Sequence, residues 1–255
     1  MRASVHSWNS GIKECSGTTR LSFEGILLLE KALEEPTFSV TGCSKIIIMD
    51  EFSKEYVIAF YDRALAMHGD RPEALRWTAK GQILHYLGLL DIAPRIGGKK
   101  VLDFGCGKGD FYQFLKERNI AVNYSGLDIN EKLISLAKLK FPECRFEVFD
   151  IEQDDLAEDF DYIFLCGVFN LKVKGLDDMI RHTLKKLFSR CRIALAFNAL
   201  SAHNPSKDFE LNYLVPEEMV SFAVGELSPF FSLRHDRISY DFVLFIYKNL
   251  NVFPE

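Results

Sequence analysis

The chain has 255 residues, a formal net charge of −5 and six cysteines, and 48% of its residues are hydrophobic. This is the composition of an ordinary globular protein. The acidic balance provides no overall positive field for a phosphate backbone, which argues against nucleic acid as a partner. No apolar run reaches the roughly 20 residues that cross a bilayer, and the first residues lack the pattern of a secretory signal. The cysteines form no C-x-x-C pair and no metal-ligand spacing. We therefore expect a cytoplasmic location, no membrane partner and no bound metal.

The sequence pattern divides the chain into three parts. Residues 1–48 are weakly patterned, and we expect a peripheral extension that is either disordered or the product of a misassigned start codon, with Met49 as the alternative start. Residues 49–98 carry helical spacing, with Ser53 and Asp70 as candidate N-caps. Two helices between Ser53 and Leu90 are predicted to form a lid, to which they contribute Trp77 and Gln82. Residues 99–250 are predicted to hold the domain that the lid covers.

From residue 99 onward, short apolar runs alternate with helical patterns. The predicted strands are 100–104, 124–127, 146–149, 162–166 and 193–197. Such alternation predicts a parallel sheet covered by helices on both faces. Two further runs, 230–233 and 242–247, are separated by a turn that we expect to contain His235 and Asp236, so they must pair antiparallel. The expected fold is α/β: a Rossmann-like, doubly wound, seven-stranded and mostly parallel sheet with an antiparallel C-terminal hairpin.

A glycine-rich turn joins the first predicted strand to the next helix. It reads Val101-Leu-Asp-Phe-Gly-Cys-Gly-Lys-Gly109, and glycines at such a turn let the backbone approach a ligand closely. Asp128 ends the second strand, where a carboxylate accepts both ribose hydroxyls of an adenosine. Asp150 ends the third strand, beside the expected position of the adenine edge. Because the carboxyl ends of parallel strands share one edge of a sheet, these features predict a single crevice that binds an adenosine.

A nicotinamide-dependent oxidoreductase would bind its dinucleotide in a similar crevice. Its fingerprint requires glycine or alanine three positions after the second glycine, and here that position is Asp110. We expect a carboxylate there to repel a pyrophosphate, whereas S-adenosylmethionine carries a sulfonium cation and no phosphate. The sequence therefore favours the sulfonium ligand, with an NAD-dependent oxidoreductase kept as an alternative.

These residues resemble the class I S-adenosylmethionine-dependent methyltransferases over about residues 49–248. Residues 103–109, 126–128, 149–151 and 161–170 look like the family's first four motifs. In the family the glycine turn wraps the methionine and ribose, the second motif's acid holds the ribose hydroxyls, and the third motif's acid meets the adenine amine. The resemblance implies S-adenosyl-L-methionine as cofactor, with these residues around it: Trp77, Asp103, Gly105, Cys106, Gly107, Asp128, Ile129, Asp150, Ile151 and Cys166. Trp77 and residues 167–170, 197–198 and 233–236 resemble an uncharacterised bacterial subgroup.

The methyl acceptor is marked less clearly than the cofactor. The fourth motif lacks the Asn/Asp-Pro-Pro-aromatic turn of enzymes that methylate base or glutamine amines, so an O or N atom of a small molecule is the expected acceptor. The weak catalytic candidates are Asn170 and Asn198 at strand ends, which are as typical of loop caps, and His235 as a general base. An RNA or protein methyltransferase and a non-catalytic S-adenosylmethionine-binding module remain as alternatives. The sequence carries no signal for the oligomeric state.

Overall fold

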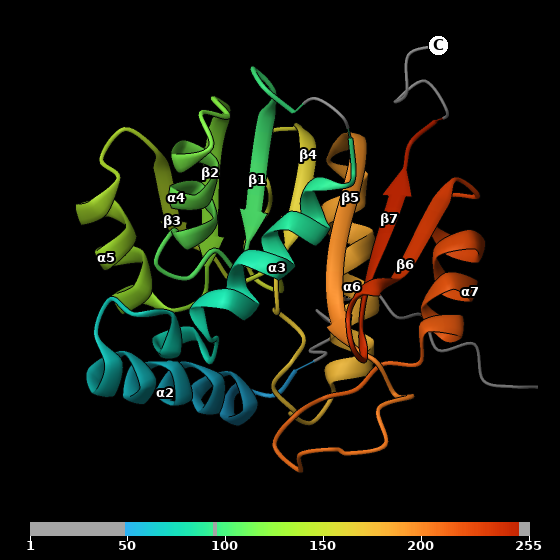
Figure 1. Ribbon diagram of the computed structural model, residues 1–255, viewed down its shortest axis with the longest axis horizontal. Helices are drawn as coiled ribbons and strands as arrows, with labels where there is room; N and C mark the ends of the chain where they lie inside the picture. Colours follow the sequence, from blue (N-terminus) through green and yellow to red (C-terminus); the bar gives the residue numbers. More distant parts are fainter. Residues whose placement is uncertain (1–48, 94–95, 250–255) are drawn as a thin grey trace, which may run out of the picture. The chain divides into compact units, whose positions relative to one another are not determined.

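The computed structural model describes residues 49–93 and 96–249. Its centre is a seven-stranded sheet with the strand order β3-β2-β1-β4-β5-β7-β6 (Figure 1). The strands are β1 (Lys100–Phe104), β2 (Asn123–Asp128), β3 (Arg145–Val148), β4 (Phe160–Leu165), β5 (Cys191–Leu200), β6 (Phe231–Ile238) and β7 (Asp241–Tyr247). The first five strands are parallel to one another, and β7 is antiparallel to both β5 and β6. The predicted fold class is confirmed. The expectations for residues 1–48 concern a segment outside the described residues.

Alternate residues of the strands feed two apolar clusters, one on each face of the sheet, because successive side chains of a strand point to opposite faces. Leu102 and Ile163 belong to one cluster, and their neighbours Val101 and Phe164 belong to the other. Helices α6 (Leu176–Ser189) and α7 (Pro216–Glu226) cover the first face. Helices α3 (Ala79–Leu90), α4 (Asp110–Glu117) and α5 (Glu131–Lys140) cover the second. The strand order reverses between β1 and β4, which is where doubly wound sheets open a crevice at the carboxyl ends of their strands.

The N-terminal helices differ from the prediction in their boundaries and in their role. Helix α2 (Glu51–His68) is capped by Asp50, whose side chain accepts the Ser53 N–H, and not by Ser53. The single helix expected after Asp70 is two elements: a 3-10 helix, η1 (Pro72–Leu75), and α3. They are separated by Arg76, whose φ of 64° is left-handed, and α3 restarts with Thr78 as its N-cap.

The expected two-helix lid is therefore corrected. Helix α2 lies across the carboxyl ends of the strands (Figure 1), whereas α3 packs in the apolar cluster of the second face through Tyr86 and Leu89. The hairpin also differs in detail, because His235 and Asp236 lie within β6 and the turn falls after Ile238. Helix α7 was not expected from the sequence. None of the helices in the described part of the chain is long and apolar enough to cross a membrane.

Candidate functional site

A cavity of about 330 Å³ opens at the carboxyl ends of the parallel strands. Its walls come from α2, the turn after η1, the loops that follow β1 to β4, the start of α6 and the segment after β5. Eight of the ten predicted cofactor residues line it: Trp77, Gly105, Gly107, Asp128, Ile129, Asp150, Ile151 and Cys166. Five segments distant in sequence thus meet at one place, and four of them lie at the carboxyl ends of strands, as the strand-end argument requires.

The glycine turn owes its shape to backbone conformations that side chains would block. Gly105 and Gly107 have φ values of 73° and 54°, in the left-handed region that favours glycine. A Cβ atom on Gly105 would lie 2.5 Å from a methyl carbon of Val168, and one on Gly107 would lie 3.0 Å from a methyl carbon of Leu75. The turn therefore brings bare backbone to the cavity wall, where a ligand can approach it closely.

Asp128 holds this turn through both of its carboxylate oxygens. Oδ2 accepts the Gly107 N–H at 2.8 Å, and Oδ1 accepts the Asn130 N–H at 2.8 Å. Burial raises the pKa of Asp128, and these backbone hydrogen bonds oppose the rise. Because a carboxylate oxygen can accept more than one hydrogen bond, each oxygen retains capacity for a ligand hydroxyl.

Asp150 is paired with a lysine that the sequence analysis did not select. Lys54, buried in the first turns of α2, lies 2.7 Å from Asp150 Oδ2 and 2.6 Å from Glu152 Oε2. Burial works against ionisation of Asp150, but the hydrogen bond and charge of Lys54 lower its pKa. One sequence signal could have indicated Lys54: it is a single lysine among acidic residues in the first turns of a helix, where a positive charge is unfavourable unless it is paired. Farther along α2, Asp62 accepts the Asn130 side-chain N–H at 2.9 Å. The helix is thereby fixed at two points.

Two predicted cofactor residues, Asp103 and Cys106, lie behind the cavity wall. Asp103 is 2% exposed, and its carboxyl group accepts a hydrogen bond from the Tyr124 hydroxyl. Burial raises the pKa of Asp103 to about 7, although the Tyr124 hydrogen bond opposes the rise. Cys106 belongs to an apolar cluster, and its burial raises the thiol pKa well above the ordinary value. Neither residue is among those that line the cavity. Both support the turn from within the core.

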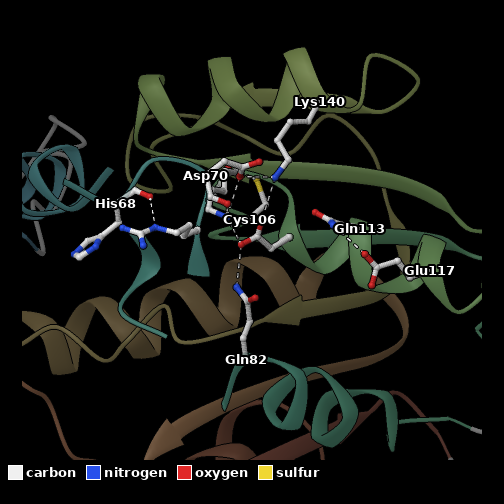
Figure 2. Close-up of polar contacts among 11 residues, drawn as sticks. His68, Asp70, Gln82, Cys106, Gln113, Glu117 and Lys140 are labelled. Carbon is white, nitrogen blue, oxygen red and sulfur yellow. Dashed lines mark hydrogen bonds and ion pairs between the residues drawn. The ribbon is translucent and has the colours of Figure 1, made fainter. Parts of the chain in front are cut away.

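Asp110 also lies outside the cavity, in a polar network whose members Asp70, Gln82 and Lys140 are labelled in Figure 2. Its Oδ1 is 2.7 Å from the Lys108 ammonium and 3.2 Å from that of Lys140, and its Oδ2 accepts the Gln82 side-chain N–H at 2.9 Å. Asp70 accepts from the same Lys140 at 2.7 Å. The charge of Asp110 is therefore balanced, and the argument that it repels a pyrophosphate is wrong in its physical basis. Gln82 serves this network and does not line the cavity.

The three catalytic candidates lie at different positions relative to the cavity. Asn170 lines the cavity. Asn198 lies behind it, fully buried: it accepts the Gly167 N–H at 2.8 Å, and its amide nitrogen is 3.1 Å from His85 Nδ1 and 3.2 Å from Asp241 Oδ2. His235 lies on the exposed edge strand β6 and does not line the cavity. The general-base assignment of His235 therefore has no geometric support.

The described residues contain no group of three or more His, Cys, Asp or Glu that could hold a metal ion. The charged side chains that line the cavity are engaged with other charged side chains or with the backbone. Lys54 pairs with Asp150 and Glu152, and Arg76 lies 3.7 Å from Glu210. What remains at the centre of the cavity is mostly apolar.

Comparison with known proteins finds related sequences for the part of the chain that contributes most of this site. Residues 102–193 match the family described as "Methyltransferase domain". A Mycobacterium tuberculosis protein whose name provisionally assigns it to the methyltransferases is 28% identical over 152 residues, which cover 57% of this chain and 91% of that protein. Trans-aconitate 2-methyltransferase of Delftia acidovorans is 32% identical over 63 residues, which cover 25% of this chain and 24% of that enzyme.

Among solved structures, magnesium protoporphyrin IX methyltransferase from Synechocystis, with bound S-adenosylmethionine, superposes with a TM-score of 0.56 at 16% identity. The superposition covers 77% of this chain and 97% of that one, which shows a shared fold. The family match, the related sequences, the strand order of the sheet and the glycine turn beside Asp128 all indicate a methyltransferase. Residues 102–193 therefore carry a methyltransferase domain, and the findings together support a class I S-adenosylmethionine-dependent methyltransferase.

Proposed function

We propose that this enzyme transfers the methyl group of S-adenosylmethionine to an O or N atom of a small molecule bound in the cavity. The observation that carries the proposal is the composition of that cavity, which joins the glycine turn and Asp128 to an apolar chamber. Methyl transfer needs the acceptor, the methyl group and the sulfur aligned in a space from which water is excluded. Helix α2 and the segment after β5 supply such an enclosure.

In the proposed arrangement each cofactor residue acts on one part of the ligand. The bare backbone at Gly105 and Gly107 admits the methionine and ribose, and Asp128 accepts the ribose hydroxyls. Asp150, oriented by Lys54, faces the adenine amine, with Ile129 and Ile151 against the ring. Cys166 and Trp77 border the end at which transfer occurs. The bound cofactor supplies a methyl group already activated by positive sulfur, so the residues of this chain mainly bind and orient.

Two features favour a small molecule over RNA or protein as the acceptor. The cavity is lined by two basic side chains, Lys54 and Arg76, and both are ion-paired within the described structure. A phosphate backbone needs available cations. The Delftia relative is named for a small organic acid, which agrees with this class of acceptor. A non-catalytic binding module has no need of an apolar chamber beyond the cofactor residues.

The test is calorimetric titration of S-adenosylmethionine and S-adenosylhomocysteine into the native protein, into Asp128→Ala and into the control Glu117→Ala. Asp128→Ala removes a charged acceptor of two hydroxyls, so we expect a loss of about 3 kcal/mol, or on the order of 100-fold in affinity. It also leaves two backbone amides without their partner, so thermal unfolding of Asp128→Ala and Asp128→Asn is measured in parallel. Glu117→Ala, an exposed acid on α4, is the matched control. Binding of NADH with neither sulfur ligand, or native affinity in folded Asp128→Ala, would contradict the proposal.

A further inference from the structure

Apart from the predicted cofactor residues, the lining of the cavity has a distinct chemistry. Its described lining is dominated by apolar side chains from five segments of the chain: Val57, Ile58, Phe60, Leu75, Val168, Leu171, Val173, Leu176, Met179, Leu200 and Leu211. Among the charged residues that line the cavity, Arg76 directly follows Leu75; it is paired with Glu210 and lies over the Phe60 ring. Burial of apolar surface is the main favourable term in such a chamber. This lining therefore favours an acceptor with an apolar body.

One buried polar atom of a residue that lines the cavity has no partner. Asn170 Oδ1 is the single buried side-chain oxygen or nitrogen without a hydrogen bond among the described residues. The backbone of Asn170 is fixed on both sides: its N–H donates to Gly167 O at 3.3 Å, and its carbonyl accepts the Asn212 N–H at 2.8 Å. The Asn212 side chain also donates to Phe169 O at 3.1 Å. A buried acceptor is unfavourable until it meets a donor. A ligand that carries an N–H or O–H supplies one.

The same lining offers no group that removes a proton near neutral pH. Burial raises the pKa of Tyr61 to about 12 and that of Cys166 well above its ordinary value. The carboxylate of Asp128 holds the backbone amides of the glycine turn, and Asp150 and Glu152 are paired with Lys54. The described histidines do not line the cavity. An O–H acceptor would need to lose its proton to become a good nucleophile, whereas a neutral amine already has a lone pair.

We propose that the acceptor is a neutral amine nitrogen on an apolar body, and that Asn170 Oδ1 accepts one N–H of this amine. The inference rests on the proposed function and narrows it from O or N to N. The nitrogen lone pair forms the new bond to the methyl carbon while the carbon–sulfur bond breaks, and its electron pair goes to sulfur. The positive charge passes from sulfur to nitrogen, and the methylated ammonium loses its extra proton to water after release. Asn170 Oδ1 faces the N–H that becomes positive. A carboxylate acceptor would instead place two partly negative oxygens together.

The experiment uses three probes of one shape: para-butylaniline, para-butylphenol and para-butylbenzoate. Each is titrated calorimetrically into the protein saturated with S-adenosylhomocysteine, and each is incubated with methyl-labelled S-adenosylmethionine for mass spectrometry. We expect the aniline to bind at least about tenfold more tightly than the benzoate and to gain one methyl group on nitrogen. In Asn170→Leu this preference should disappear while the affinity for S-adenosylhomocysteine stays native.

Two further variants keep the test decisive. Asn170→Asp retains an acceptor oxygen and should retain the preference for the aniline, even if Asn170→Leu folds poorly. Asn123→Leu, at the exposed start of β2, is the control and should behave as the native protein. Methylation of the phenol in place of the aniline, equal binding of the benzoate, no probe binding, or an unchanged preference in Asn170→Leu would overturn the inference. Failure to bind S-adenosylhomocysteine would instead overturn the proposed function, so the two failures are distinguishable.

Discussion

Replacing Asp103 by asparagine is expected to stabilise the protein at neutral pH, with a gain that vanishes in acid. Burial raises the pKa of Asp103 from 3.8 to about 7, and the nearby charges of Asp128 and Asp110 add to the rise. The folded protein therefore holds a proton that the unfolded chain releases between these two values. The favourable contribution of the neutral carboxyl is fully present below pH 3.8 and is lost as the pH rises through 7. A shift of about three units corresponds to about 4 kcal/mol, which is the upper limit of the gain.

The assay is urea unfolding, followed by circular dichroism, of the native protein and Asp103→Asn between about pH 4 and pH 8. The difference in unfolding free energy isolates this one group, because carboxylates with lowered pKa, such as Asp150, contribute equally to both curves. Tyr124→Phe removes the hydrogen bond that lowers the Asp103 pKa, so it should steepen the pH dependence. Glu117→Gln, an exposed control, should give a flat difference. A pH-independent difference for Asp103→Asn, or lower stability than native at pH 8, would refute the reasoning.

Two further substitutions probe the cavity wall. Lys54→Met should destabilise the fold by about 3–5 kcal/mol, because it leaves the carboxylates of Asp150 and Glu152 without their cation, and it should also weaken cofactor binding. Chemical denaturation measures the first effect and calorimetric titration the second. Native stability of the variant would mean that solvent screens the charges of this ion-paired group. Gly167→Ala should cost about 1–3 kcal/mol, since φ is 71° and the added Cβ would lie 2.5 Å from Trp77 Cζ2. The control is Gly225→Ala, where nothing lies within 4 Å of the added Cβ and an alanine in the helix should be neutral or stabilising. Both variants are compared by thermal unfolding. Equal melting temperatures would contradict the predicted strain at Gly167.

Features that depend on local pattern were predicted from the sequence. The alternation of strands and helices, the closing hairpin and the cavity position of Gly107, Asp128 and Asp150 follow from periodicity and from the rule that parallel strands end at one edge. A glycine turn and a strand-end acid are encoded by residues that are neighbours either in sequence or across one strand pairing. Such features need no knowledge of distant contacts.

The rest was decided by contacts between distant segments. Asp110 was expected to act as a free charge, but Lys140, 30 residues away, helps to balance it. The helix expected after Asp70 is interrupted at Arg76, where a left-handed residue turns the chain toward the cavity before Thr78 caps a new helix. Sequence alone could not show that Lys54 would reach Asp150.

Asn170 and Asn198 show the limit most clearly, because both are asparagines that follow neighbouring predicted strands, each directly after a phenylalanine. His85 from α3 and Asp241 from β7 engage Asn198 in the core, whereas Asn170 is left at the cavity wall with one oxygen unpartnered. The sequence by itself determined which residue types stand at the carboxyl edge of the sheet. Only the tertiary structure decided which of them are satisfied by the protein and which are available to a ligand, since hydrogen-bond partners come from segments that are remote along the chain.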